Sequence, residues 1–282
     1  MTVLRVRHRT TFEYAGPVTA SYNEARLTPS RGPGQRLLDS RLTIEPHTWT
    51  HDYVDYWGTA VTAFEVLREH ERLEIVAASR VELPDDGLAA PGEGNAWEVV
   101  AGPAFRDTMA AYLADSETTR APQELHELAR EVSAGAATPD DAARAVALAV
   151  RDRLEYVPGV TTVHTTADEA WAAGKGVCQD ISHLVLGALR RLGIPARYVS
   201  GYLHPQPDAA VGETVAGESH AWVEWWAGGW RPFDPTNRTD VSTDHVALGR
   251  AREYGDVSPL KGVYAGEGRG ELDVRVEITR VR

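Results

Sequence analysis

Three residues of this chain have side chains that together could break an amide bond: Cys178, His220 and Asp234. A thiol attacks a carbonyl carbon well only as the thiolate, which the N-terminal end of a helix and a neighbouring imidazolium both stabilise. A histidine beside the thiol serves as the base, and a carboxylate orients that histidine. We therefore predict a thiol-dependent enzyme with Cys178 as nucleophile, His220 as base and Asp234 as the orienting residue.

Cys178 is expected at the start of a helix. Apolar residues follow it at helical spacing, and Gly193-Ile194-Pro195 ends the pattern: Ile181, Leu184, Val185, Ala188 and Leu192. Before it, Gly174-Lys175-Gly176-Val177 allows a tight turn into the helix, where free amides could bind an oxyanion. Position alone is weak support, because a lone cysteine is more often a small buried hydrophobe. As the only cysteine of the chain, Cys178 cannot form an internal disulfide.

His220 and Asp234 are expected on the two strands of one hairpin. A three-residue loop, Ala227 to Gly229, would place them one diagonal apart on the same face, and a five-residue loop from Trp225 would place them opposite each other. An even loop would separate them unless a bulge intervened. Taken singly, each residue has a structural explanation. His220 could be a hydrogen-bonded structural histidine, and Asp234 could cap a turn before Pro235.

Two regions differ in periodicity. Residues 1 to about 100 alternate with period two and predict an antiparallel β domain, with a tight turn at Asp55-Tyr56-Trp57-Gly58. The segment Pro84 to Pro103, rich in Pro, Gly and acidic residues, is the best candidate for a linker. Residues 101–282 mix helical and strand patterns. The predicted fold class is α+β, with an N-terminal β domain followed by a catalytic domain.

In the second region, Thr138-Pro139 predicts the start of a helix reaching Leu154, and Thr166 with Glu169 predicts a capping box. The other expected segments are a helix over 167–173, strands over 196–203, 220–226, 230–234 and 272–281, and a mobile loop over 205–217. The sequence does not indicate where the last strand packs.

Charge excludes two classes of partner. A formal net charge of -12 disfavours nucleic acid and anionic membrane surfaces, because both attract Lys and Arg. The first residues, Met1 to Tyr14, contain no unbroken apolar run, so neither a secretory signal nor an anchor is expected. A single cysteine fits a reducing compartment, and we predict a cytoplasmic protein.

The same residues carry a resemblance to a known family. Gly176-Val177-Cys178-Gln179-Asp180, Leu192 to Tyr202, Ser219 to Glu224 and Phe233-Asp234-Pro235-Thr236 resemble the bacterial transglutaminase-like family, and the N-terminal region resembles the β domain that precedes its catalytic domain. The resemblance implies a papain-like fold with catalytic Cys178, His220 and Asp234, in a family that includes proteases, amidases, deamidases and acyl transferases.

The resemblance also points to Tyr156, at the position where transglutaminases place an aromatic donor near the oxyanion; a core tyrosine is an equal alternative. Related eukaryotic enzymes use calcium, but no Asp-rich loop of calcium-binding spacing occurs here, so we expect no metal and no cofactor. The expected partner is a peptide or another amide-containing substrate, with either water or an amine as the acyl acceptor. The sequence leaves open that choice, the substrate and the oligomeric state.

Two other interpretations compete. One is a non-catalytic binding or scaffold protein that keeps the fold, and the other is a metal site that joins the three residues, with or without His183. Asp180 is expected to cap the cysteine helix, and His183 to be packing or surface. The tryptophans at 222, 225, 226 and 230 are expected either to line an acyl-binding groove or to lie in the core.

Overall fold

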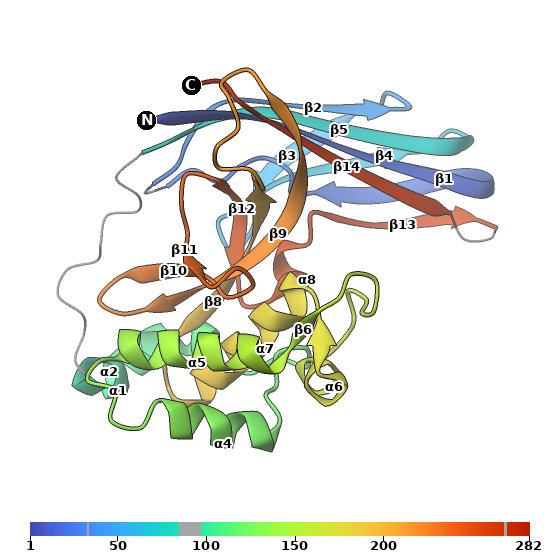
Figure 1. Ribbon diagram of the computed structural model, residues 1–282. Helices are drawn as coiled ribbons and strands as arrows, with labels where there is room; N and C mark the ends of the chain where they lie inside the picture. Colours follow the sequence, from blue (N-terminus) through green and yellow to red (C-terminus); the bar gives the residue numbers. More distant parts are fainter. Residues whose placement is uncertain (33, 85–96, 268–269) are drawn as a thin grey trace.

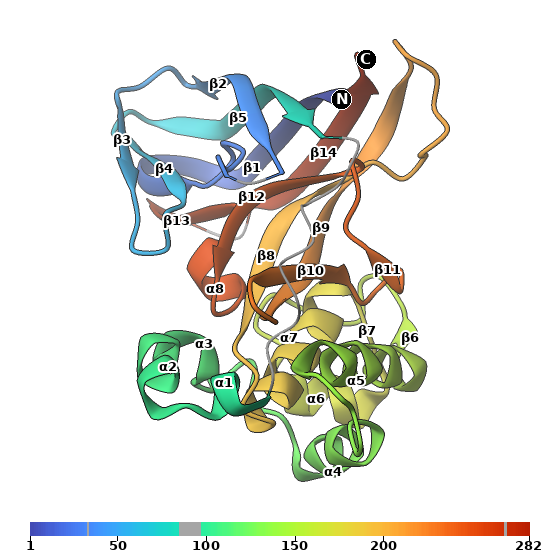
Figure 2. The same cartoon turned by 90° about the vertical axis from the view of Figure 1, so that its left-hand side faces the viewer.

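The computed structural model describes residues 1–32, 34–84, 97–267 and 270–282. These residues form a twelve-stranded sheet with antiparallel pairing and a cluster of helices at one end of the molecule (Figure 1). Figure 2 shows the central strands between the N-terminal strands and the helices. The α+β class predicted from the change of periodicity is confirmed.

The N-terminal strands are organised around one long strand, β1. Its first half pairs with β5 and β14, and its second half with β4 and β13. The N-terminal strands are β1 (Thr2–Ala25), β2 (Arg36–Glu45), β3 (Thr50–Val54), β4 (Ala60–Val66) and β5 (His70–Leu83). Leu4 and Val6 are two residues apart and therefore point to the same face of the sheet, where both are fully buried. The predicted turn between β3 and β4 is present, with the carboxylate of Asp55 accepting the backbone N–H of Trp57 and of Thr59.

The last two strands return to the N-terminal sheet. They are β13 (Leu260–Gly266) and β14 (Glu271–Arg280). On one side β14 pairs with β1 over ten residues, from Leu4 opposite Arg280 to Glu13 opposite Glu271, and on its other side it pairs with β9. The end of the chain therefore joins the N-terminal strands to the strands that carry His220 and Asp234.

Four helices, α3 to α6, pack against α7, whose residues from Gln179 to Arg190 are all buried. The helices are α1 (Trp97–Ala101), α2 (Pro103–Thr108), α3 (Ala110–Leu113), α4 (Gln123–Val132), α5 (Pro139–Arg153), α6 (Ala167–Ala173), α7 (Cys178–Arg191) and α8 (Tyr254–Val257). Of the predicted linker, residues 85–96 lie outside the described part of the chain. Residues 97–101 form α1 instead, and Val100 of this helix is buried.

Two predicted helix starts are confirmed by their caps. The hydroxyl of Thr138 accepts the backbone N–H of Asp141, whose carboxylate accepts the N–H of Thr138. Thr166 and Glu169 make the same reciprocal pair at the start of α6. These bonds satisfy amides that have no partner within the helix, so α5 and α6 begin where the sequence indicates.

The central strands carry the candidate site. They are β8 (Ala196–Leu203), β9 (Thr214–Trp226), β10 (Trp230–Asp234), β11 (Thr239–Asp240) and β12 (His245–Ala251). The predicted loop over 205–217 is wrong at its end, because residues 214–217 extend β9 and pair with β14. Gly217 lies in this paired segment, where a Cβ would come within 2.6 Å of the Ile278 side chain. A short parallel pair, β6 (Glu155–Tyr156) and β7 (Lys175–Gly176), precedes α7.

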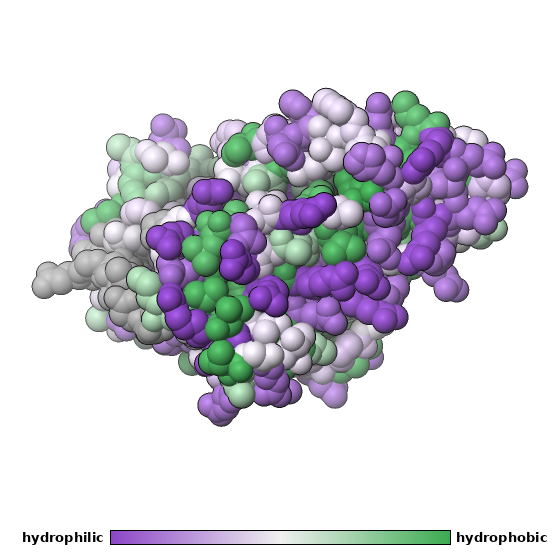
Figure 3. All heavy atoms as spheres, turned by 90° about the horizontal axis from the view of Figure 1, so that it is seen from above, coloured by the Kyte–Doolittle hydropathy of each residue, from purple (hydrophilic) through white to green (hydrophobic). Residues whose placement is uncertain are grey.

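Seen from above, the face around β2, β5 and β14 is mainly hydrophilic, with narrow apolar strips between hydrophilic side chains (Figure 3). Within the described ranges, no helix combines the length and the apolar character needed to cross a membrane.

Candidate active site

Cys178 is the first residue of α7, and Asp180 holds this end of the helix. The Asp180 carboxylate is buried and accepts the backbone N–H of Val177 at 2.8 Å and the hydroxyl of Thr161 at 2.7 Å. Burial raises the pKa of Asp180. Gly176 allows this packing, since a Cβ there would lie 2.8 Å from Asp180. Asp180 is thus the expected helix cap, although it binds the amide before the helix rather than those of its first turn.

His220 and Asp234 lie on adjacent strands of a hairpin with a three-residue loop. Trp226 pairs with Trp230, and Val223 with Phe233, so His220 and Asp234 are one diagonal apart on the same face. The Nε2 atom of His220 is 2.7 Å from Oδ2 of Asp234. Of the registers that the sequence left open, the three-residue loop is the one formed.

Cys178 also lies close enough to His220 to favour its charged form. Because Nε2 binds Asp234, Nδ1 is the ring nitrogen left for the sulfur. Burial disfavours the charged imidazolium, but hydrogen bonds and charges of Asp234 and Cys178 outweigh it and raise the pKa of His220 to about 10. At neutral pH the ring therefore carries a proton on each nitrogen and lies between two groups that can hold negative charge.

Asp234 is fully buried and receives five hydrogen bonds. Oδ1 accepts the backbone N–H groups of Thr236 and Asn237. Oδ2 accepts His220, the side-chain amide of Asn237 at 2.8 Å and a second histidine, His245, at 3.2 Å. Burial alone would raise the pKa of this carboxyl, but these hydrogen bonds hold it far below its usual value.

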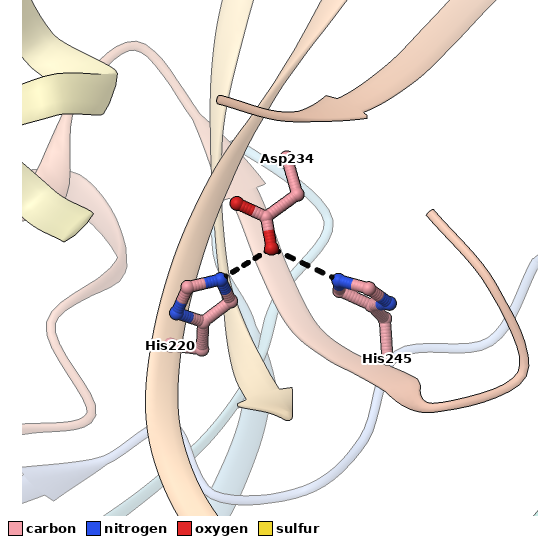
Figure 4. Close-up of side chains that lie close together, drawn as sticks. All are labelled: His220, Asp234 and His245. Carbon is pink, nitrogen blue, oxygen red and sulfur yellow. Dashed lines mark hydrogen bonds and ion pairs between the residues drawn. The ribbon is translucent and has the colours of Figure 1, made fainter. Parts of the chain in front are cut away.

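His245 is the residue of this site that sequence analysis missed. It begins β12, it is buried, and it approaches Asp234 from the side opposite His220 (Figure 4). Its place depends on the pairing of β12 with β8, where His245 lies opposite Leu203. No local periodicity indicates that pairing. Asn237, by contrast, lies in the turn after Asp234, and a turn amide capping a carboxylate could have been inferred from the sequence.

The nitrogen and oxygen atoms of His220, Asp234 and His245 lie within 4.8 Å of one another, close enough to be considered as metal ligands. An ionised carboxylate only accepts hydrogen bonds, so both imidazole Nε2 atoms must be donors to Oδ2. A cation would have to displace both protons. The contacts are thus those of a hydrogen-bond network, in which each donor already has its acceptor.

Tyr156 lies beside the cysteine rather than in the core. β6 and β7 align Tyr156 with Gly176, two residues before Cys178, and 38% of the tyrosine is exposed. Burial, followed by the charges of Cys178, Glu218 and Asp234, raises the pKa of Tyr156. The phenol therefore stays protonated at neutral pH and can donate a hydrogen bond near the sulfur.

The remaining candidates lie elsewhere. His183 is buried, accepts the backbone N–H of Tyr254 at 3.1 Å, and has a pKa lowered by burial to about 3, so it is a neutral packing residue. Trp222 and Trp225 are buried in the core. Trp230 is half-buried and stacks on the guanidinium of Arg197, 3.9 Å from the ring centroid. Trp222, Trp225 and Trp230 therefore do not form one wall.

Comparison with known proteins gives the family of this chain. Residues 126–235 match the transglutaminase-like superfamily, and residues 4–82 match the bacterial transglutaminase-like N-terminal region. Uncharacterized proteins of Mycobacterium leprae and Mycobacterium tuberculosis are similar: the first is 41% identical and covers 99% of both chains, and the second is 32% identical and covers 97% of this chain and 91% of its own.

A crystal structure of a candidate cysteine protease from Cytophaga hutchinsonii superposes with a TM-score of 0.78 at 19% identity, over 100% of this chain and 91% of the other. This likeness supports the fold, including the N-terminal sheet. Both halves of the sequence and the whole fold thus lead to one conclusion: the chain belongs to the transglutaminase-like superfamily, with the bacterial transglutaminase-like N-terminal region.

Proposed function

We propose that the protein is a thiol-dependent enzyme that acts on amide bonds through an acyl-enzyme intermediate, with Cys178 as nucleophile, His220 as acid and base, and Asp234 as orienting residue. The observation that carries this proposal is the position of His220, whose Nε2 lies 2.7 Å from Oδ2 of the buried Asp234 and whose charged form is favoured by the neighbouring Cys178. A histidine kept only for packing needs neither an adjacent thiol nor a buried carboxylate.

In the first step the thiolate of Cys178 attacks the amide carbonyl carbon, so that a C–S bond forms and the carbonyl oxygen becomes an oxyanion. The free amides at the start of α7 and the hydroxyl of Tyr156 are the donors available to that oxygen. The proton on Nδ1 of His220 passes to the amide nitrogen, the C–N bond breaks, and the amine leaves. Cys178 then carries a thioester.

In the second step an acceptor releases the acyl group. His220, now neutral, takes a proton from the acceptor, which attacks the thioester carbon and expels the thiolate. Water as acceptor gives a carboxylic acid, and an amine gives a new amide. We favour hydrolysis of a peptide or a related amide, because no recognisable second-substrate motif occurs in the sequence. We also propose a cytoplasmic location, where a single thiol stays reduced.

Alkylation of Cys178 by iodoacetamide tests this proposal. At pH 6 an ordinary thiol is largely protonated, whereas a thiolate paired with His220 would react faster than free cysteine. Each alkylated molecule can be assigned at once, because the chain has a single cysteine. The His220→Ala variant is the control and should react at a rate close to that of free cysteine. A parent rate no faster than free cysteine at pH 6 would favour the scaffold interpretation.

A further inference from the structure

We propose that His245 is a positioning residue: in its neutral form it donates one hydrogen bond to Asp234 and thereby holds the carboxylate in the orientation that His220 needs. This inference rests on the proposed function. The Nε2 atom of His245 is 3.2 Å from Oδ2 of Asp234, the same oxygen that binds His220 at 2.7 Å (Figure 4). Both rings are buried.

The protonation of His245 follows from its second nitrogen. Nδ1 lies 3.2 Å from the backbone nitrogen of Ser242 and accepts its hydrogen. A backbone N–H can only donate, so Nδ1 carries no proton and the single ring proton is on Nε2, directed at Asp234. In an imidazolium, Nδ1 would also carry a hydrogen. That N–H would point at the backbone N–H of Ser242, and the hydrogen bond between them would be lost. The tight turn from Ser242 to His245, closed by the bond from the backbone N–H of His245 to the carbonyl of Ser242 at 3.1 Å, holds this geometry.

Neutrality decides what His245 contributes. Asp234 has one negative charge, and a second imidazolium would compete with His220 for it. A neutral donor occupies a lone pair of Oδ2 without taking that charge. The backbone amides of Thr236 and Asn237 hold Oδ1, so the carboxylate is fixed at both oxygens and cannot rotate away from His220.

Substitution of His245 by leucine removes the donor at similar volume, and His245→Gln keeps an N–H at the position of Nε2. We expect His245→Leu to lower kcat on an amide substrate about 10- to 100-fold, with KM within twofold, by analogy with the outer hydrogen-bond partners of metal-ligating residues. His245→Gln should recover most of the loss. His204→Leu is the matched control, because His204 is also buried and its Nδ1 also accepts a backbone N–H, that of Gln206, at 3.3 Å.

The outcomes separate the two proposals. If parent kcat survives in His245→Leu, or if His204→Leu loses as much, the positioning role is wrong. If Cys178 in the parent is not alkylated faster than free cysteine, the proposed function fails instead. Rapid inhibition of the parent by stoichiometric zinc, absent in both His245 variants, would overturn the hydrogen-bond role in favour of a metal site.

A measurement on the parent protein covers the case in which His245→Leu does not fold. The nitrogen NMR shifts of a histidine distinguish the Nε2–H form, the Nδ1–H form and the imidazolium. We expect His245 to be the neutral Nε2–H form at pH 7 and His220 to be the imidazolium. An imidazolium or an Nδ1–H ring at position 245 contradicts the proposal.

Discussion

Two buried carboxylates lie on adjacent strands of this protein, Glu224 on β9 and Asp234 on β10, and they have different kinds of partner. Glu224 binds two guanidinium groups: Arg197 at 2.6 Å and Arg250 at 2.9 Å, each measured from Nε. Burial favours the neutral acid, but the charges of Arg250 and Arg197 outweigh it and lower the pKa of Glu224. The side-chain partners of Asp234 are instead the imidazoles of His220 and His245 and the amide of Asn237.

The difference lies in what the partners can do with a proton. Arginine stays charged at every accessible pH, so the Glu224 cluster is fixed and can only stabilise the fold. Histidine can give up its proton where arginine cannot, even with the raised pKa of about 10 at His220, so we expect this partner of Asp234 to pass one to a substrate. Burial and a carboxylate therefore do not mark a reactive site by themselves. A titratable partner beside a nucleophile does.

The largest expected effect is on the nucleophile side of the Asp234 cluster. Cys178→Ala should abolish covalent turnover, and His220→Ala should come close, because an unpaired thiol is mostly protonated near pH 7. Turnover of an amide substrate accepted by the parent is the measurement, with melting temperature alongside. Parental turnover in Cys178→Ala would end the thiol mechanism.

Asp234→Asn should cost less activity, about tenfold to a thousandfold in kcat, scaled down from serine triads because the orienting residue of papain-like thiols can be a neutral amide. We also expect a lower melting temperature. All five hydrogen bonds at Asp234 come from donors, so the amide NH2 of an asparagine must face at least one of them. Activity equal to that of the parent would remove Asp234 from the mechanism.

Glu224→Gln is the matched change in the other cluster and should separate stability from activity. It leaves two guanidinium groups without their buried counter-charge, which we expect to cost roughly 3 kcal/mol in the free energy of unfolding, measured in urea. At a temperature where the variant is folded, kcat should stay within about twofold of the parent. A loss of kcat as large as that of Asp234→Asn would show that the two clusters are not functionally distinct.

Alkaline pH should weaken the Asp234 cluster and not the Glu224 cluster. The pKa of His220 is about 10 in the folded protein, above the ordinary value of 6.5, so its contribution to stability is complete below pH 6.5 and is lost as the pH rises through 10. We expect the free energy of unfolding to fall by a few kcal/mol over this window, on the order of one kcal/mol per pH unit. His220→Ala should show a flatter dependence, and an equally steep one would contradict the assignment.

The smallest expected effect is at Tyr156. Tyr156→Phe removes the hydroxyl beside the sulfur and should lower kcat by about tenfold or less, since the amides of α7 remain as donors. Alkylation of Cys178 should be unchanged, because that reaction forms no oxyanion. Steady-state rates and alkylation rates on the same preparation check both statements. Equal loss in both would mean that Tyr156 acts on the thiol.

Local patterns were sufficient for the parts of the site that lie close in sequence. The capping residues before α5 and α6 and the apolar spacing after Cys178 define helices through contacts three or four residues apart. The period of two along β9 and β10 placed His220 and Asp234 on one face once the loop length was known. The extent of β9 was mispredicted, because residues 214–217 are ordered by β14, some sixty residues later in the sequence.

The sequence by itself was sufficient to predict Cys178, His220 and Asp234 as a candidate triad and to predict the elements that carry them, because each prediction depends on residue type and on short spacing. The tertiary structure alone decided that β14 closes the gap between β1 and β9, that Tyr156 pairs with Gly176 two residues before Cys178, and that His245 reaches Asp234. These contacts join segments that lie far apart along the chain, so no periodic pattern of residues indicates them. They form only because strand pairing and burial bring the segments together, and their energy depends on partners that no local window contains.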